Sequence, residues 1–426
     1  MRTEFTAAQL GDPETAASHA NIRRCVHCGF CTATCPTYVL LGDERDSPRG
    51  RIELIRTMLE KDEAPSKATV THIDRCLSCL ACVTTCPSGV DYAQLIDHAR
   101  HHIEETYRRP WPERLLRAAI PAVLTKPRRL RFALALGRLA RPLAPLFQRF
   151  NLAPVAALLE LVPERQRREG LREKAGANNR GRVALLQGCV EPAMAPSIRA
   201  AAARLLTRMG FEVVDVKGEG CCGALSEHLG RADEAAALAR KNVRAWEQAG
   251  PLVAVVATAA GCGTTLKGYD RRLGAAGAEA AAKARDILEF VAEAGLPPVV
   301  RPGAMVVAYH APCSLQHGQR IKAAPAALLA EAGFEVREPA EAHICCGSAG
   351  VYNVLQPKLA GELRERKAAN LAATKARVVA AGNIGCIAQI APALDLPVIH
   401  PVELLDWATG GPEPAALGAA AQGPKR

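Results

Sequence analysis

The sequence predicts an α+β multidomain protein, in which a mainly α-helical N-terminal domain is followed by two copies of a parallel-sheet α/β domain. Two observations predict this architecture. Amphipathic segments with helical spacing dominate the chain up to residue 107. Beyond residue 180, short Val-rich runs alternate with Ala-rich charged segments, and one pattern of cysteines occurs twice. Strands that alternate with helices are typical of parallel α/β layers.

The cysteine content narrows the chemistry of this chain. Its 426 residues are enough for several domains and include 16 cysteines. The N-terminal residues carry acidic side chains and no apolar core of a signal peptide. We therefore expect a reducing compartment, the cytoplasm, where metal or redox chemistry explains many cysteines better than disulfides do. No stretch approaches the roughly 18 apolar residues of a membrane-spanning helix.

Two cysteine runs with the same spacing lie in the N-terminal region. CVHCGFCTATCP and CLSCLACVTTCP both fit C-x2-C-x2-C-x3-C-P, the run that binds 4Fe-4S clusters in bacterial two-cluster ferredoxins. In those ferredoxins the first three cysteines of a run bind one cluster and the fourth binds the other. The predicted ligands are Cys25, Cys28, Cys31 and Cys86 for one [4Fe-4S] cluster, and Cys76, Cys79, Cys82 and Cys35 for the other.

Structural zinc is the alternative for these loops, because paired C-x2-C spacings also suit tetrahedral zinc. Two complete quartets, each ending in Cys-Pro, favour iron-sulfur clusters. Between the loops, RGRIELIRTMLEKDE has the period of an amphipathic helix. Its inward residues would be Ile52, Ile55, Met58 and Leu59. Arg49 and Arg51 either begin this helix or act electrostatically on a cluster, and we expect a helical ferredoxin domain over 1–107.

The positive charge is concentrated in one segment. Residues 108–182 hold 18 Lys and Arg against five Glu and no Asp, a net charge of +13, whereas the rest of the chain sums to −2. Pieces such as KPRRLRFALALGRLARPLAPLF are amphipathic. We expect a basic helical linker over 108–180 that docks on anionic lipid or on an acidic partner, or is only a solvated connector. Nucleic acid is not an expected partner, because only 4% of the residues are aromatic and no binding motif accompanies the charge.

The other eight cysteines form an internal duplication. They are Cys189, Cys221, Cys222 and Cys262, and then, at a constant offset of 124 residues, Cys313, Cys345, Cys346 and Cys386. A repeat of this length predicts two copies of one domain. We expect the first cysteine-rich CCG repeat over 181–300, the second over 301–410, and a flexible tail over 411–426.

In both repeats an apolar run ends shortly before a cysteine. The runs are VALLQG before Cys189, VVATAAG before Cys262, VVAYHAP before Cys313 and VVAAGNIG before Cys386. Because ligands gather at the carboxyl ends of parallel strands, distant cysteines of one repeat can converge there. The two adjacent cysteines of each repeat can share a metal only if the backbone turns, which Gly223 and Gly347 permit. Each repeat could hold a further iron-sulfur cluster or zinc; buried structural cysteines and thiol or disulfide chemistry are the alternatives.

The two C-x2-C-x2-C-x3-CP loops followed by two CCG repeats resemble the iron-sulfur subunit of bacterial glycolate oxidase (glycolate dehydrogenase). The likeness extends beyond the cysteines over nearly the whole chain. The matching segments include RRCVHCGFCTATCPTYVLLGDERDSPRGRIELI, RCLSCLACVTTCPSGVDY, GCCGAL, APCSLQHGQ and HICCGSAG. The anaerobic glycerol-3-phosphate dehydrogenase C subunit, lactate-utilisation proteins and heterodisulfide reductase subunits share this two-part plan.

The resemblance implies an electron-transfer subunit of an oxidoreductase, peripheral on the cytoplasmic face of the inner membrane. FAD-containing partner subunits would oxidise glycolate to glyoxylate, and this chain would pass the electrons to a quinone or other membrane acceptor. The sequence has no G-x-G-x-x-G fingerprint in a strand-turn-helix context, so we expect FAD on partner subunits only and no catalytic residue here. The alternatives are the iron-sulfur subunit of a lactate or glycerol-3-phosphate dehydrogenase, a heterodisulfide-reductase-like thiol or disulfide enzyme, and a scaffold with structural metals.

The repeats depart from the heterodisulfide reductase type, whose last element is C-x-x-C. Here that element is a single cysteine, with Ala259 or Asn383 three residues before it and Thr265 or Gln389 three residues after. Four thiolates suffice for a cubane cluster or for zinc, so two, three and four clusters in total all remain open. His310, His317 and His343 lie near the second set of cysteines, as metal ligands or as hydrogen-bonded structural residues.

Overall fold

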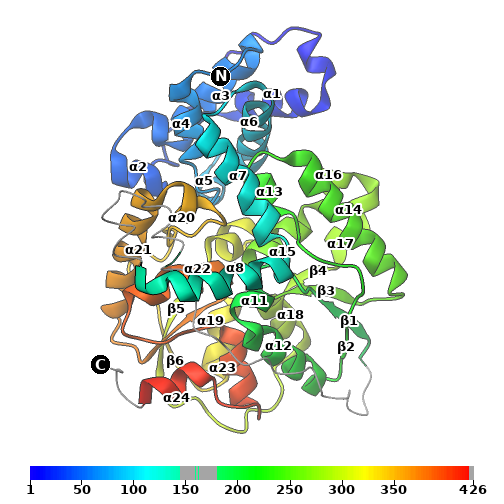
Figure 1. The fold of residues 1–426 in the computed structure, drawn as a ribbon, viewed down its shortest axis with the longest axis vertical. Helices are drawn as coiled ribbons and strands as arrows, with labels where there is room; N and C mark the ends of the chain where they lie inside the picture. The colour runs from blue at the N-terminus through cyan, green and yellow to red at the C-terminus, as the bar shows by residue number, and fades with distance from the viewer. Residues whose placement is uncertain (144–158, 160–161, 163–179, 422–426) are drawn as a thin grey trace.

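The N-terminal domain is helical, as the sequence predicts. The structure is a computed structural model that describes residues 1–143, 159, 162 and 180–421. The first elements are η1 (Gln9–Gly11), α1 (Pro13–Arg24), α2 (Pro36–Leu41), η2 (Glu44–Asp46), α3 (Pro48–Lys61), α4 (Lys67–Asp74), α5 (Ala81–Thr85) and α6 (Tyr92–Thr106). They form the upper, blue part of Figure 1. Ile22, Ile55 and Leu95, from α1, α3 and α6, are fully buried in one cluster.

Polar side chains fix where these helices begin. The side chains of Asp12, Ser47, Ser66 and Asp91 accept hydrogen bonds from backbone N–H groups of the first turns of α1, α3, α4 and α6. Such N-caps satisfy donors that a helix otherwise leaves free. The predicted inward face of α3 is confirmed, because Ile52, Ile55, Met58 and Leu59 are all buried.

Helices α7 (Trp111–Leu124) and α8 (Pro127–Ala140), followed by η3 (Arg141–Leu143), form the described part of the predicted basic linker. Its residues 144–158, 160–161 and 163–179 lie outside the described residues. Part of the basic charge is used inside the protein: Arg109 and Arg117 are buried and pair with Asp74 at 2.6 and 2.9 Å. These ion pairs hold the start of the linker against the ferredoxin domain.

Each CCG repeat forms a four-stranded parallel sheet, as predicted. The first contains β1 (Arg182–Leu185), β2 (Glu212–Val214), β3 (Ala254–Ala257) and β4 (Ala284–Asp286) in the order β2-β1-β3-β4. The second contains β5 (Val306–His310), β6 (Glu335–Arg337), β7 (Val378–Ala381) and β8 (Val398–Ile399) in the order β6-β5-β7-β8. Val183 pairs with Ala254, and Val307 pairs with Val378. The offset that relates the cysteines therefore also relates the register of the central strands.

Helices cover both sheets (Figure 1). The first repeat contains α11 (Glu191–Met194), α12 (Pro196–Arg208), α13 (Ala224–His228), α14 (Ala232–Gln248), α15 (Ala260–Lys267), α16 (Tyr269–Leu273), α17 (Ala275–Lys283) and α18 (Ile287–Ala294). The second contains η4 (Ser314–Gly318), α19 (Ala324–Glu331), α20 (Tyr352–Leu355), α21 (Pro357–Ala372), α22 (Ile384–Ile390), η5 (Ala391–Ala393) and α23 (Pro401–Ala408).

The segment predicted as a flexible tail contains a further helix, α24 (Ala415–Ala421). Its sequence is rich in alanine, which has the highest helix propensity. Leu417 is buried against the core of the two repeats. The described residues of this segment therefore include a helix that the sequence analysis did not predict.

One face of each sheet lies in an apolar core that the two repeats share. One continuous cluster joins Leu185 and Val256 of the first repeat to Val307 and Leu405 of the second, all of them fully buried. Helix α12 contacts α23, and α18 contacts α19. Each repeat therefore buries a large part of its apolar surface against the other repeat, which the sequence alone did not indicate.

A buried ion pair lies at this junction. Asp406 of α23 is 1% exposed and accepts a hydrogen bond from Arg204 of α12 at 2.6 Å. Arg208, one turn further along α12, pairs with the same carboxylate. Two arginines of the first repeat thus converge on one carboxylate of the second.

Replacing Asp406 by Ala should lower the free energy of unfolding by about 2–3 kcal/mol, because two guanidinium groups lose a buried charged acceptor. The urea midpoint of the purified chain measures this loss. The control Glu279→Ala removes an exposed pair with Lys283 within α17 and should leave the midpoint unchanged. Equal midpoints for the two variants would contradict the role of Asp406.

Candidate metal centres

The two ferredoxin loops fold together so that one small cavity is lined by cysteines of both. Cys25, Cys28 and Cys31 come from the first loop and Cys86 from the end of the second, and the cavity is about 30 Å³. Cys25 directly follows α1, and Gly29 turns the loop with φ +84. The structure therefore brings together the first quartet of cysteines predicted from the sequence.

A second cavity, of about 20 Å³, lies next to the first. Its cysteines are Cys35, Cys76, Cys79 and Cys82, the second predicted quartet. Cys35 precedes α2, and Cys82 lies on α5. Because Cys82 lines both cavities, the two sites share a wall.

The chemistry of these thiols fits iron-sulfur ligation. All eight are free cysteines. Burial raises the pKa of Cys31 to about 11 and raises the pKa of Cys79 and Cys82 well above that of an ordinary thiol. Bare thiolates are unfavourable in such surroundings unless a positive charge compensates them. An iron core would supply that charge, with the thiolates as its ligands.

Arg51 lies beside the second quartet. It is 1% exposed, and its Nη1 is 3.8 Å from Sγ of Cys35. Its Nε donates to the carbonyl of His72 at 2.7 Å, and Nη2 pairs with Asp46 at 3.3 Å. A permanent buried cation at this point stabilises negative charge on the sulfur. The sequence indicated that Arg51 is buried, because Arg51 lies on the same helical face as the apolar Ile55 and Met58.

The cysteines of the CCG repeats lie at strand ends, as predicted. Cys189 follows β1 and Cys313 follows β5, whereas Cys262 and Cys386 lie in the first turns of the helices after β3 and β7. The turns after the adjacent cysteines are confirmed by φ +97 at Gly223 and φ +88 at Gly347. A Cβ atom at Gly347 would lie 2.5 Å from the carbonyl oxygen of Ala360, so only glycine fits there without a shift.

The four thiols of each repeat lie next to one another. In the first repeat, Cys222 and Cys262 have their sulfur atoms 3.3 Å apart, and Cys221 contacts both Cys189 and Cys222. The second repeat has the same order of contacts: Cys313 contacts Cys345, Cys345 contacts Cys346, and Cys346 contacts Cys386. The predicted convergence of cysteines that are distant in the sequence is therefore confirmed.

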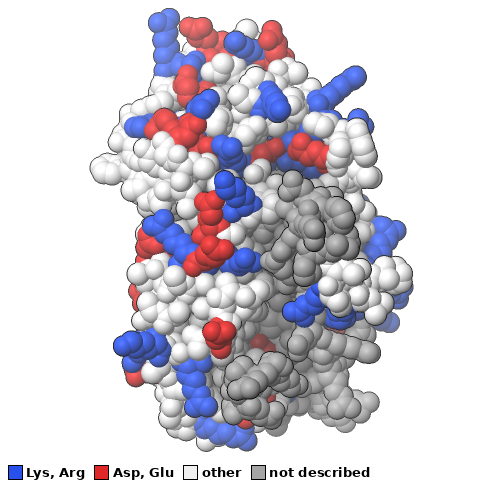
Figure 2. All heavy atoms as spheres, turned by 60° about the vertical axis from the view of Figure 1, so that its left-hand side comes forward, with Lys and Arg blue, Asp and Glu red and all other residues white. Residues whose placement is uncertain are grey.

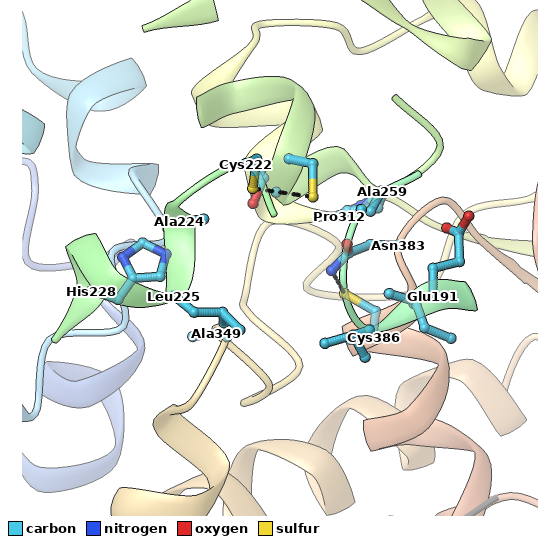
Figure 3. A pocket seen from close by; sticks show the side chains of 18 of the residues that line it. Glu191, Cys222, Ala224, Leu225, His228, Ala259, Pro312, Ala349, Asn383 and Cys386 are labelled. Atoms are coloured by element: carbon cyan, nitrogen blue, oxygen red, sulfur yellow. Dashed lines mark hydrogen bonds between the residues drawn. The ribbon is translucent and has the colours of Figure 1, made fainter. Parts of the chain in front are cut away.

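Both repeats open onto one central cavity of about 170 Å³ (Figure 3). Its cysteines are Cys189, Cys222, Cys262, Cys313, Cys345, Cys346, Cys386 and Cys79. Figure 3 shows Cys222 and Cys386, one from each repeat, on its walls. Cys79 also lines the second ferredoxin cavity. Neighbouring cavities therefore share lining cysteines. Cys82 lies between the two ferredoxin cavities, and Cys79 lies between the second ferredoxin cavity and the central cavity.

One carboxyl group of the central cavity was missed by sequence reasoning. Glu191 of α11 is buried, and Oγ1 of Thr258 donates a hydrogen bond to it at 2.6 Å. Burial raises the pKa of Glu191 to about 7, so this group can exchange a proton near neutral pH. An acidic residue in an amphipathic-looking EPAM segment gives no sequence signal of such burial.

The three histidines near the second repeat differ in their surroundings. His317 contacts Oγ1 of Thr84 at 2.8 Å and the carbonyl of His343 at 3.4 Å, so it connects the second ferredoxin loop with the second repeat. His310 is buried, and within the described part of the chain neither of its ring nitrogens has a hydrogen-bond partner. His317 is therefore a hydrogen-bonded structural residue.

The fold and these sites define an iron-sulfur protein that combines a two-cluster ferredoxin domain with two CCG repeats. Known families match the same segments: a 4Fe-4S dicluster domain matches residues 24–90, and a cysteine-rich domain named CCG matches residues 183–267 and 307–391. Within the described ranges, no helix has the length and apolar character needed to cross a membrane.

Curated relatives resemble the whole chain. The glycolate oxidase iron-sulfur subunit of Escherichia coli (strain K12) is 39% identical over 417 residues, which are 96% of this chain and 99% of the relative. The probable glycolate oxidase iron-sulfur subunit of Bacillus subtilis (strain 168) is 30% identical over 92% of this chain and 93% of the relative. This chain belongs to the family of glycolate oxidase iron-sulfur subunits and is part of an oxidoreductase complex.

Two further similarities have lower sequence identity. Lactate utilization protein A of Macrococcus caseolyticus is 27% identical over 53% of this chain and 96% of the relative. A crystal structure of a hypothetical protein from Helicobacter pylori aligns with a TM-score of 0.55 over 95% of this chain and 74% of that chain, at 9% identity. That alignment shows a shared fold.

Proposed function

We propose that this chain is the electron-transfer subunit of a glycolate oxidase (glycolate dehydrogenase) complex. A partner subunit with FAD oxidises glycolate to glyoxylate, and the electrons and protons released reduce a quinone-type acceptor at the membrane. The observation that carries the proposal is the contiguity of the three thiol-lined cavities through Cys82 and Cys79. The names of the two full-length relatives support glycolate as the substrate of the complex.

Two [4Fe-4S] clusters supply one-electron redox chemistry when bound. We assign the first to Cys25, Cys28, Cys31 and Cys86 and the second to Cys76, Cys79, Cys82 and Cys35. The chain's own residues exclude water from the second site, since Cys35, Cys76 and Cys82 are buried. Arg51 holds a fixed positive charge beside Cys35, which favours a reduced, more negative site.

Substitutions can test whether the fourth cysteine of each loop binds the cluster of the other loop. Cys86→Ala should remove about four of roughly eight irons per chain and abolish the electron paramagnetic resonance signal that Cys25→Ala abolishes. Cys35→Ala should instead match Cys76→Ala. Anaerobically purified full-length chain is used throughout. If Cys86→Ala removed the signal that depends on Cys76, the assignment would be wrong.

The electron-transfer role is tested on the complex purified with its flavin subunits. Glycolate should reduce the clusters of this chain in the anaerobic complex, and should leave the isolated chain oxidised, because the flavin is on the partner. D-lactate, L-lactate and glycerol 3-phosphate are the competing substrates in the same assay. If one of these substrates reduced the clusters and glycolate did not, that substrate would replace glycolate in the proposal. If the complex reduced a disulfide in preference to a quinone, the alternative function as a thiol or disulfide enzyme would be favoured.

We also propose that α8 docks the chain on the anionic cytoplasmic face of the inner membrane. Phe132, Leu136 and Leu139 are exposed along one side of α8, with Leu139 79% exposed, next to the exposed Arg128 and Arg129. Exposed apolar side chains flanked by arginine suit the headgroup boundary. Figure 2 shows one face of the molecule, on which acidic and basic side chains are interspersed.

Charge reversal of Arg128, Arg129 and Arg131 to Glu should reduce binding to vesicles of phosphatidylglycerol at least several-fold, because each basic residue near an anionic surface contributes about 1 kcal/mol. Co-sedimentation at low and high salt measures the binding. The matched control reverses Arg240, Lys241 and Arg244, which are exposed on α14, and should bind like the wild type. Equal binding of both triple variants would refute docking through α8.

A further inference from the structure

The side chain of His310 is a buried polar group. The side chain is 1% exposed at the end of β5, and within the described part of the chain neither ring nitrogen is hydrogen-bonded. Buried polar groups in proteins are nearly always paired, and an exception calls for an explanation, such as a bound ion or water. Imidazole is the commonest metal ligand among the side chains.

The imidazole lies against two thiols. One ring nitrogen of His310 and the sulfur atoms of Cys346 and Cys386 all lie within 4.8 Å of one another. Neighbouring strands produce this arrangement: His310 pairs with Ala381 across β5 and β7, and Cys386 lies on the helix that follows β7. The turn at Gly347 brings Cys346 to the same point.

Apolar side chains pack against the two thiols of this triad. Leu371, Val379 and Ile390, all fully buried, pack with Cys346 and Cys386 in one cluster. These side chains offer no hydrogen bond to the imidazole or to the thiols. The polar neighbours of the two thiols are Asn383, whose Nδ2 donates to Sγ of Cys386 at 3.6 Å, Cys345, which contacts Cys346, and the buried ammonium group of Lys367.

The compact spacing favours a mononuclear site. Zinc is bound at about 2.3 Å by thiolate and about 2.0–2.1 Å by imidazole, so tetrahedral ligand atoms lie roughly 3–4 Å from one another. Within the described ranges, the ferredoxin cysteines form no comparably compact group of three. The triad is therefore suited to one ion rather than to a cluster.

The first repeat is an internal comparison. The position that corresponds to His310 is occupied by Leu186, which packs against Cys222. A second difference is Lys367, which is buried near the thiols and donates to the carbonyl of Glu341 at 2.7 Å, where the first repeat has Val243. At these two positions the second repeat has a nitrogen donor and a cation, where the first repeat has apolar side chains.

We propose that the second repeat binds one Zn²⁺ ion through a ring nitrogen of His310 and the sulfur atoms of Cys346 and Cys386. Binding releases the two thiol protons. Cys346 and Cys386 line the central cavity and His310 does not, so the fourth position opens toward the cavity and its remaining thiols. Zinc has no redox chemistry, so this site is distinct from the electron-transfer role proposed above.

The test compares His310→Leu, which reproduces the first repeat, with the wild type. Anaerobically purified full-length chain should contain about one zinc per chain, and its zinc X-ray absorption should show both imidazole nitrogen and sulfur. His310→Leu should lose at least nine-tenths of the zinc while the two ferredoxin signals stay intact. His343→Leu removes a neighbouring histidine and should keep the zinc.

A second variant keeps the test independent of folding defects. His310→Cys should retain zinc, with the nitrogen contribution to the absorption spectrum replaced by sulfur. The proposal is overturned by wild-type protein without zinc, by full zinc in His310→Leu, or by an unchanged nitrogen signal in His310→Cys. Imidazole coordination to iron instead of zinc in the wild type would also overturn it. None of these readouts depends on glycolate oxidation.

Discussion

The common direction of the strands is the constraint on which the cysteine sites of the two CCG repeats depend. All strands within a sheet are parallel, so their carboxyl ends share one edge, where the chain leaves each strand and turns into a helix. Thiols that are up to 73 residues apart in the sequence, such as Cys189 and Cys262, reach one place for this reason. An antiparallel sheet would have sent alternate loops to opposite edges.

The ferredoxin domain closes that edge. Cys79 reaches the central cavity, and Leu77 packs in one cluster with Cys313 and Ile344. The contact between Thr84 and His317 fixes the same junction. Thiols that would face solvent in an isolated repeat are therefore enclosed between three domains. Enclosure disfavours bare thiolates and makes the sites dependent on bound cations.

Much of this arrangement could be predicted from the sequence, because it depends on local signals. Cysteine spacing indicated the two quartets, short Val-rich runs indicated the strands, and the glycines at 223 and 347 indicated the turns. The assignment of particular cysteines to particular metal centres stays a prediction. Contacts between distant elements carry no such periodic signal. For this reason the shared core, the reach of Cys79 into the central cavity and the position of the His310 imidazole beside Cys346 and Cys386 emerged only in three dimensions.

The shared core also affects how the protein is made. Helix α12 ends at Arg208, but its partner α23 begins only at Pro401. A ribosome that adds about 5–20 residues per second therefore leaves the apolar face of α12 without its native cover for roughly ten to forty seconds. During that interval the nascent chain exposes a surface that can aggregate, so a gene split between the two repeats would yield two fragments that each need the other to fold.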